Sequence, residues 1–262
     1  MTRSFLFAQD SADAATTRLI ALAAAVTGFM KGEPGPPPPL WYQPGGDNHV
    51  MVGQLHAALA AAYPQAGPPL HAVRLWTNLL WQPAYLAVIG AHIHGAVPDF
   101  GGFSQGRRGV YVDGYRLLPA PQVAGSPEKL IEHAGGQIRI MAATMLEEVN
   151  LWAPLKPLPA RRLLAERMLS LMVWLHARRP ALGQEKIATY ADLWLDVLGL
   201  QGQGSFETVV AEGRSLVLVK RKGCCLDYLL DPDRLCANCP RQDKALRLAR
   251  QTANALAELP GR

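Results

Sequence analysis

The chain has 262 residues, of which 49% are hydrophobic and 18% are charged, and its formal net charge is +5. This composition is typical of a globular protein with one domain or two closely packed ones. A chain of this length can bury a sizeable core without disulfide staples. The sequence shows neither a nucleotide-binding glycine pattern nor a recognisable nucleic-acid-binding motif, so neither class of partner is expected.

The N-terminal part predicts a helix followed by a proline-rich linker. The apolar run at 19–30 is too short to span a bilayer, and Asp10 and Asp13 before it are unlike the basic start of an export signal. Residues 32–46 contain six prolines and are expected to form an extended linker or surface loop. We therefore expect a cytoplasmic protein, in which thiols stay reduced.

The next two segments are expected to be helical. Residues 50–63 predict a helix that ends at Pro64. Residues 70–91 are strongly apolar, but polar side chains and Pro83 interrupt them. These interruptions argue against a membrane span and favour a buried helix that is kinked near the proline.

A hairpin and a short helix are expected next. Residues 110–117 place two β-rich arms around Asp113 and Gly114, a pair preferred in type I′ turns. Ser126 resembles a helix N-cap, and the glycines at 135–136 are expected to end that helix.

The rest of the body predicts amphipathic helices, because apolar residues recur at three- and four-residue steps. The expected ranges are 138–152, 160–178 and 184–198. A strand at 215–221 and a hairpin partner at 224–230 are expected to follow, and a closing helix begins near Pro240.

All four cysteines of the chain lie within 16 consecutive positions near its C-terminus. Cys224 and Cys225 are adjacent, ten residues follow, and Cys236 and Cys239 form a Cys-x-x-Cys pair. Four thiols this close together, with none elsewhere, indicate one four-ligand site rather than a disulfide framework.

Disulfides, a redox-active pair and structural zinc are the alternatives to an iron–sulfur cluster. Adjacent Cα atoms lie about 3.8 Å apart, which is too close for an unstrained bridge between Cys224 and Cys225. A thioredoxin-like pair at Cys236 and Cys239 would leave two thiols over and lacks a βαβ context. Zinc accepts four cysteines, but usually from two separated Cys-x-x-Cys knuckles. A [2Fe–2S] cluster, with two thiolates per iron, fits the cysteine spacing better than a zinc site does, and zinc remains the alternative.

The cysteine pattern resembles the C-terminal signature of the siderophore ferric-iron reductases, the FhuF-like family. That signature combines a vicinal cysteine pair, a spacer and a Cys-x-x-Cys, often with a basic residue shortly before it. Here Arg221 stands three positions before Cys224. The resemblance covers residues 215–245, and upstream it extends only to the general layout of a helical body.

The resemblance implies a [2Fe–2S] cluster that reduces siderophore-bound ferric iron by one electron inside the cell. Its implied ligands are the four cysteines, Cys224, Cys225, Cys236 and Cys239. Arg221 is then a candidate for hydrogen bonding to sulfur, which would tune the cluster, or for docking a partner. The implied partners are a ferric siderophore and a soluble electron donor, such as a ferredoxin, a flavodoxin or a separate reductase. The alternative is a zinc-clipped structural or binding module for an anionic partner, without redox activity.

Basic residues gather around the cysteines. Residues 214–250 contain nine Lys or Arg residues and four Asp residues, so this stretch carries a formal charge of +5, the same as the whole chain. Such a patch favours electron uptake by an anionic cluster and steers an acidic electron donor towards it. A solvated helix face would produce the same charge pattern.

Together these features predict an α+β protein with a mainly helical body, a small antiparallel sheet and a C-terminal, cysteine-bearing iron–sulfur subdomain. We expect an N-terminal helix and proline-rich linker at 1–48, a helical reductase-like body at 49–213 and a [2Fe–2S]-binding segment at 214–262. No membrane span and no nucleic-acid partner are expected.

Overall fold

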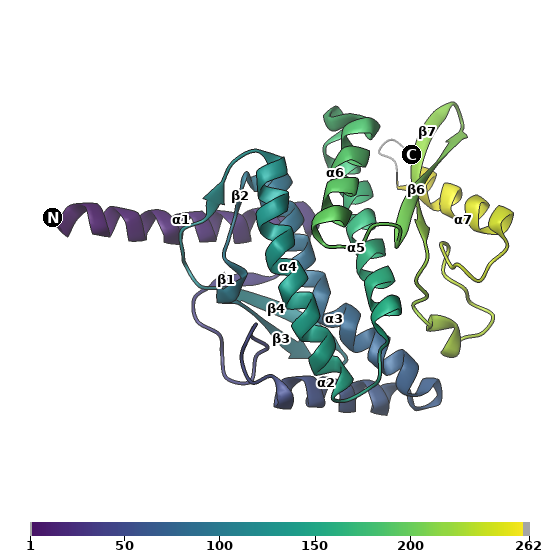
Figure 1. Ribbon diagram of the computed structural model, residues 1–262, viewed down its shortest axis with the longest axis horizontal. Helices are drawn as coiled ribbons and strands as arrows, with labels where there is room; N and C mark the ends of the chain where they lie inside the picture. Colours follow the sequence, from purple (N-terminus) through teal and green to yellow (C-terminus); the bar gives the residue numbers. More distant parts are fainter. Residues whose placement is uncertain (1, 259–262) are drawn as a thin grey trace.

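The computed structural model describes residues 2–258, with side chains from residue 12 onward, and it is mainly helical with short strands (Figure 1). The helices are α1 (Thr2–Thr27), α2 (His49–Ala62), α3 (Gly67–Ile89), α4 (Pro127–Asn150), α5 (Pro157–Arg178), α6 (Gly183–Val197) and α7 (Lys244–Ala257). The strands are β1 (Gly32–Pro34), β2 (Ala96–Val97), β3 (Phe103–Arg108), β4 (Tyr111–Leu117), β5 (Val123–Ala124), β6 (Gly204–Ala211) and β7 (Arg214–Arg221). The predicted α+β class is confirmed, as are the helices expected at 50–63, 160–178 and 184–198.

Helix α3 is the central element of the helical body. It contacts α2, α4 and α5, and α6 packs in turn against α4 and α5. Most α3 side chains are buried, including Pro83 inside the helix, so the buried helix expected at 70–91 is confirmed. Its end continues as a π-helical turn at Gly90–His94. Within the described residues, none of the helices combines the length and hydropathy of a membrane-spanning segment.

Three small sheets lie beside the helices. Strand β1 pairs in parallel with β4, which pairs antiparallel with β3, whereas β2–β5 and β6–β7 form two antiparallel pairs. The proline-rich stretch expected as a linker or surface loop supplies β1. Tyr42 in the same stretch is fully buried and donates a hydrogen bond to Glu148 Oε2 at 2.7 Å. A buried tyrosine hydroxyl needs such a partner, so this stretch is packed onto α4.

The hairpin of β3 and β4 turns earlier in the chain than expected. The two strands are joined through Gly109, whereas Asp113 and Gly114, predicted as the turn, lie inside β4. The pairing register shifts there, so that this Asp-Gly pair faces Gly106 alone as a β-bulge. The prediction was wrong because a bulge and a type I′ turn both use a glycine with positive φ, and Gly114 has φ of +79°.

Helix α4 continues through the glycine pair that was expected to end it. Its predicted cap is confirmed, since Ser126 Oγ accepts a hydrogen bond from the backbone N–H of Lys129. A Cβ atom built on Gly135 would lie 2.6 Å from Cγ1 of Val197 on α6. The glycine therefore permits close packing of α4 against α6, and this tertiary contact outweighs the low helix propensity of glycine.

The glycine pair provides a matched test of this packing. Gly136 has no neighbouring atom where a Cβ would stand. We expect Gly136→Ala to raise the free energy of unfolding by about 0.5–1 kcal/mol, because alanine favours the helix. Gly135→Ala is expected to lower it by about 1–3 kcal/mol, because the added methyl group overpacks the interface with Val197. Urea unfolding followed by circular dichroism measures both, and equal effects would contradict the packing argument.

The C-terminal part is built on the hairpin of β6 and β7. The strand expected at 215–221 is confirmed as β7, but its partner is the preceding strand β6 rather than 224–230. A two-residue turn joins the strands at Glu212 and Gly213, which both have positive φ, as a type I′ turn requires. Residues 222–243 contain no strand, only a 3₁₀ turn.

Candidate metal centre

The cysteines lie in the irregular segment between β7 and α7, which folds back against α5. The hairpin partner expected at 224–230 would place Cys224 and Cys225 at the start of a strand. The chain instead bends directly after the pair, where Leu226 has a left-handed backbone with φ of +62°. A left-handed residue interrupts extended structure, so the two thiols are presented from a turn rather than from a sheet.

Gly223 allows this segment to lie directly on α5. A Cβ atom at this position would approach the backbone of Arg162 and Leu163 to 3.2 Å. The backbone of a helix cannot move far to make room for an added methyl group. We therefore expect Gly223→Ala to displace the cysteine segment and to destabilise the protein by about 1–3 kcal/mol. The iron content of the purified protein and its thermal midpoint measure this effect. Lys222→Ala, at an exposed neighbouring position, is the control.

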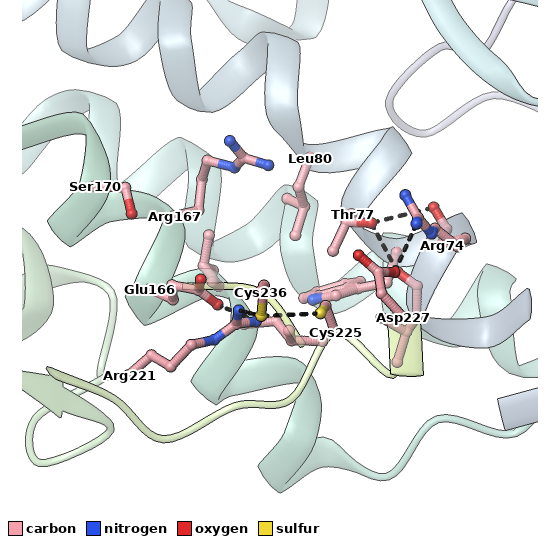
Figure 2. Close-up of a pocket in the computed structure, with 14 residues that line it drawn as sticks. Arg74, Thr77, Leu80, Glu166, Arg167, Ser170, Arg221, Cys225, Asp227 and Cys236 are labelled. Atoms are coloured by element: carbon pink, nitrogen blue, oxygen red, sulfur yellow. Dashed lines mark hydrogen bonds and ion pairs between the residues drawn. The ribbon is translucent and has the colours of Figure 1, made fainter. Parts of the chain in front are cut away.

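The structure brings the four predicted cysteines into one region. All four thiols are free; Cys239 is buried and the others are half-buried. The Sγ atoms of Cys225 and Cys236 lie 3.8 Å apart (Figure 2). Burial raises the pKa of Cys224, and the nearby sulfurs of Cys225 and Cys239 add to this shift. Within the described residues, no three histidine, cysteine or acidic side chains converge on a single-ion site.

Cys225 and Cys236 interact most strongly. The sulfurs of Cys225 and Cys236 share a hydrogen bond in which either atom can be the donor, and this bond lowers the pKa of Cys225 to about 6 despite partial burial. The same bond raises the pKa of Cys236. The hydrogen bond thus favours the thiolate form of Cys225, and the thiolate is the form of cysteine that binds metals.

Arg221 lies beside this thiol pair. Its side chain is only 5% exposed, and Nη2 lies 2.7 Å from Oε2 of Glu166 on α5. The Nη1 atom lies 3.5 Å from Cys236 Sγ and 3.1 Å from Asn238 Oδ1. The guanidinium group thus connects the Cys-x-x-Cys turn to the helical body, and it places a buried positive charge against a sulfur atom.

Two residues that were not predicted from the sequence fix the cysteine segment to the body. Glu166 is the buried partner of Arg221, and burial raises its pKa although the guanidinium opposes this shift. Arg74 on α3 forms an ion pair of 2.6 Å with Asp227, which follows the vicinal cysteines. The only local sign that Glu166 has a special role is that this acidic residue lies within the apolar stripe of α5. The Arg74–Asp227 pair spans 153 positions and leaves no local pattern.

Helix α7 holds the Cys-x-x-Cys turn in place. It begins at Lys244, later than the expected start near residue 240, because Asp243 caps it. Gln242 Nε2 donates a hydrogen bond of 2.6 Å to the backbone oxygen of Cys236. Arg247 on α7 forms a buried ion pair of 2.6 Å with Glu207 on β6. The turn is therefore supported from both the helix and the hairpin.

A cavity of about 250 Å³ lies against the Cys225 and Cys236 thiols, between α3 and α5 (Figure 2). On these two helices its walls combine apolar side chains with polar ones; the apolar residues are Val73, Trp76, Leu80, Leu163 and Leu164, and the polar ones are Arg74, Thr77, Glu166, Arg167 and Ser170. Arg167 lies on the opposite side of the cavity from the sulfur atoms (Figure 2). A group that enters this cavity reaches the thiol pair directly.

Comparison with protein families identifies the cysteine segment. Residues 221–241 match the family model of the FhuF 2Fe-2S C-terminal domain, a range that begins at Arg221 and includes all four cysteines. No solved structure matches the chain. The chain therefore carries a FhuF 2Fe–2S C-terminal domain, whose cofactor is a [2Fe–2S] cluster, as the family resemblance of the cysteine pattern implied.

Proposed function

We propose that the protein reduces siderophore-bound ferric iron, and that Cys224, Cys225, Cys236 and Cys239 hold the cluster. When bound, a [2Fe–2S] cluster supplies one electron per cycle. The observation that carries the proposal is the cavity that ends on the sulfur atoms of Cys225 and Cys236. A ferric chelate docked there would have its iron close to the ligand sulfurs, and electron transfer requires such proximity.

The groups around the thiols suit a cluster of this kind. Arg221 Nη1 lies 3.5 Å from Cys236 Sγ, and backbone N–H groups after the vicinal pair donate to the sulfurs of Cys224 and Cys225. Hydrogen bonds and positive charge near sulfur stabilise the reduced, more negative state and raise the reduction potential. Arg221 is thus proposed to tune the potential rather than to touch the substrate.

The electron balance needs a separate reductant. One electron passes to the ferric iron, which becomes ferrous and is held more weakly by hard oxygen chelators because its charge is lower. A soluble donor inside the cell, such as a ferredoxin, a flavodoxin or a separate reductase, then returns one electron. The formal charge of +5 in residues 214–250 supports an acidic donor, because opposite charges speed association.

Anaerobic purification tests the proposal. The expected result is a red-brown protein with about two irons and two sulfides per chain, which bleaches on reduction. The reduced protein is then mixed separately with a ferric bis-catecholate and with a ferric trihydroxamate, and a ferrous-specific chelator traps the released iron. A colourless protein with about one zinc per chain would contradict the proposal and support a zinc-clipped binding module. A loaded cluster that ferric chelates do not reoxidise would contradict the reductase activity alone.

A further inference from the structure

A second hollow of about 910 Å³ lies on the surface beside the thiol cavity. The two share Arg74, Thr77 and Arg167 in their walls, and together they are called the recess. The outer part is lined by the link between α1 and β1, by α3 and by the tip of the β3–β4 hairpin. Ligand-binding clefts for small molecules commonly have this size, about 300–1,000 Å³.

The hairpin wall of the recess is fixed to α3. Asn78 Oδ1 accepts a hydrogen bond of 3.0 Å from the backbone N–H of Val112, and Trp81 Nε1 donates one of 3.1 Å to the backbone oxygen of the same residue. Both side chains belong to the central helix. The recess is therefore formed before a ligand arrives, which lowers the entropic penalty of binding.

The recess is lined by two more basic residues than acidic residues. Three acidic residues line it, and each pairs with an arginine: Arg74–Asp227, Arg108–Asp113 and Arg221–Glu166. Among the described lining residues, Lys31 and Arg167 are the cations that form no salt bridge, although the charge of Arg167 also acts on the Glu166 carboxyl and opposes the rise in its pKa. Lys31 belongs to the outer hollow, and Arg167 lies where the two hollows join. An anion on the way to the thiol pair would neutralise both.

Aromatic rings line the same outer hollow. Phe29 is 44% exposed and Tyr111 is 58% exposed, and the Phe29 ring packs against Trp81 with centroids 5.9 Å apart. Exposed rings beside unpaired cations suit a ligand that carries aromatic groups and negative charge.

We infer that this recess selects net-anionic ferric chelates with aromatic ligand groups, of the catecholate type, over neutral hydroxamate chelates. This inference rests on the proposed function, since it names the substrate class of the same site. Each catecholate carries two negative charges and a ring, so two of them leave a ferric complex with a net negative charge. Three hydroxamates, with one charge each, leave a neutral complex without rings.

Binding of redox-inert gallium complexes tests the selectivity without requiring electron transfer. The probes are gallium(III) complexes of a tetradentate bis-catecholate and of a hexadentate trihydroxamate, and equilibrium dialysis against the cluster-loaded protein gives both Kd values. We expect the bis-catecholate complex to bind about tenfold more tightly, with a preference that declines as salt is added. Lys31→Gln and Arg167→Gln are each expected to weaken its binding about threefold to tenfold, with little effect on the neutral complex.

Two further variants sharpen the test. Tyr111→Leu removes an exposed ring and is expected to weaken the bis-catecholate complex alone. Arg139→Gln removes an exposed cation of α4, outside the recess, and is expected to change neither affinity. Equal affinity for the two complexes, or equal effects of Arg139→Gln and Arg167→Gln, would overturn the inference even if ferric chelates are reduced. Selective binding of the gallium complex supports the inference even if reduction of ferric iron fails, and that failure would contradict the proposed function only.

Discussion

Replacing Cys236 by serine is expected to abolish the [2Fe–2S] cluster while the helical body stays folded. Cys236 is the cysteine whose Sγ atom lies 3.8 Å from that of Cys225 and whose sulfur contacts Arg221. A serine hydroxyl has a similar size, but it is protonated at neutral pH and is a hard ligand, so it replaces a thiolate poorly. Iron and sulfide contents and the visible absorption are expected to decrease to background, with unchanged far-ultraviolet circular dichroism.

Ala237→Ser is the matched control for this variant. Position 237 lies in the same Cys-x-x-Cys turn, so the control introduces the same hydroxyl one residue away without removing a thiol. We expect it to retain the cluster. A Cys236→Ser protein with the full iron and sulfide content would show that Cys236 is not a ligand, and equal losses in both variants would indicate a damaged turn instead.

Replacing Arg221 by methionine is expected to lower the free energy of unfolding by about 3–5 kcal/mol, because it leaves the buried carboxylate of Glu166 without its partner. The side chains of Arg221 and Glu166 are 5% and 16% exposed, so solvent screens the lost interaction little. Urea unfolding followed by tryptophan fluorescence measures the change. Lys220→Met, at an exposed position on the same strand, is expected to change stability by less than about 0.5 kcal/mol.

A double variant separates the charge pair from the shape of the site. Arg221→Met combined with Glu166→Leu removes both buried charges, so much of the lost stability is expected to return. Its cluster is still expected to have a lower reduction potential than that of the unmodified protein, because no cation remains beside Cys236. If the double variant loses as much stability as the two single variants added together, the buried-pair explanation is contradicted. An unchanged reduction potential of the cluster would contradict the tuning role of Arg221.

Local patterns predicted most helices of this protein but not all of its turns. The cap at Ser126 and the apolar stripes of α4, α5 and α6 depend on residues that are close in sequence, so the sequence predicted them correctly. Two local signals fit two structures equally well. Asp113–Gly114 suits a turn or a β-bulge, and the glycine pair at 135–136 suits the end or the interior of a helix. Packing against Gly106 and against Val197 decided between these structures.

The cysteine site divides in the same way. The spacing of the four cysteines, the basic charge around them and Arg221 before them were readable from the sequence, because ligand spacing within one short segment is a local property. The partner of β7, the pairing of Arg221 with Glu166 and of Asp227 with Arg74, and the recess that leads to the thiols were decided by the tertiary structure. Each of these features joins side chains from separate helices and strands, and only the folding of the whole core brings such residues together.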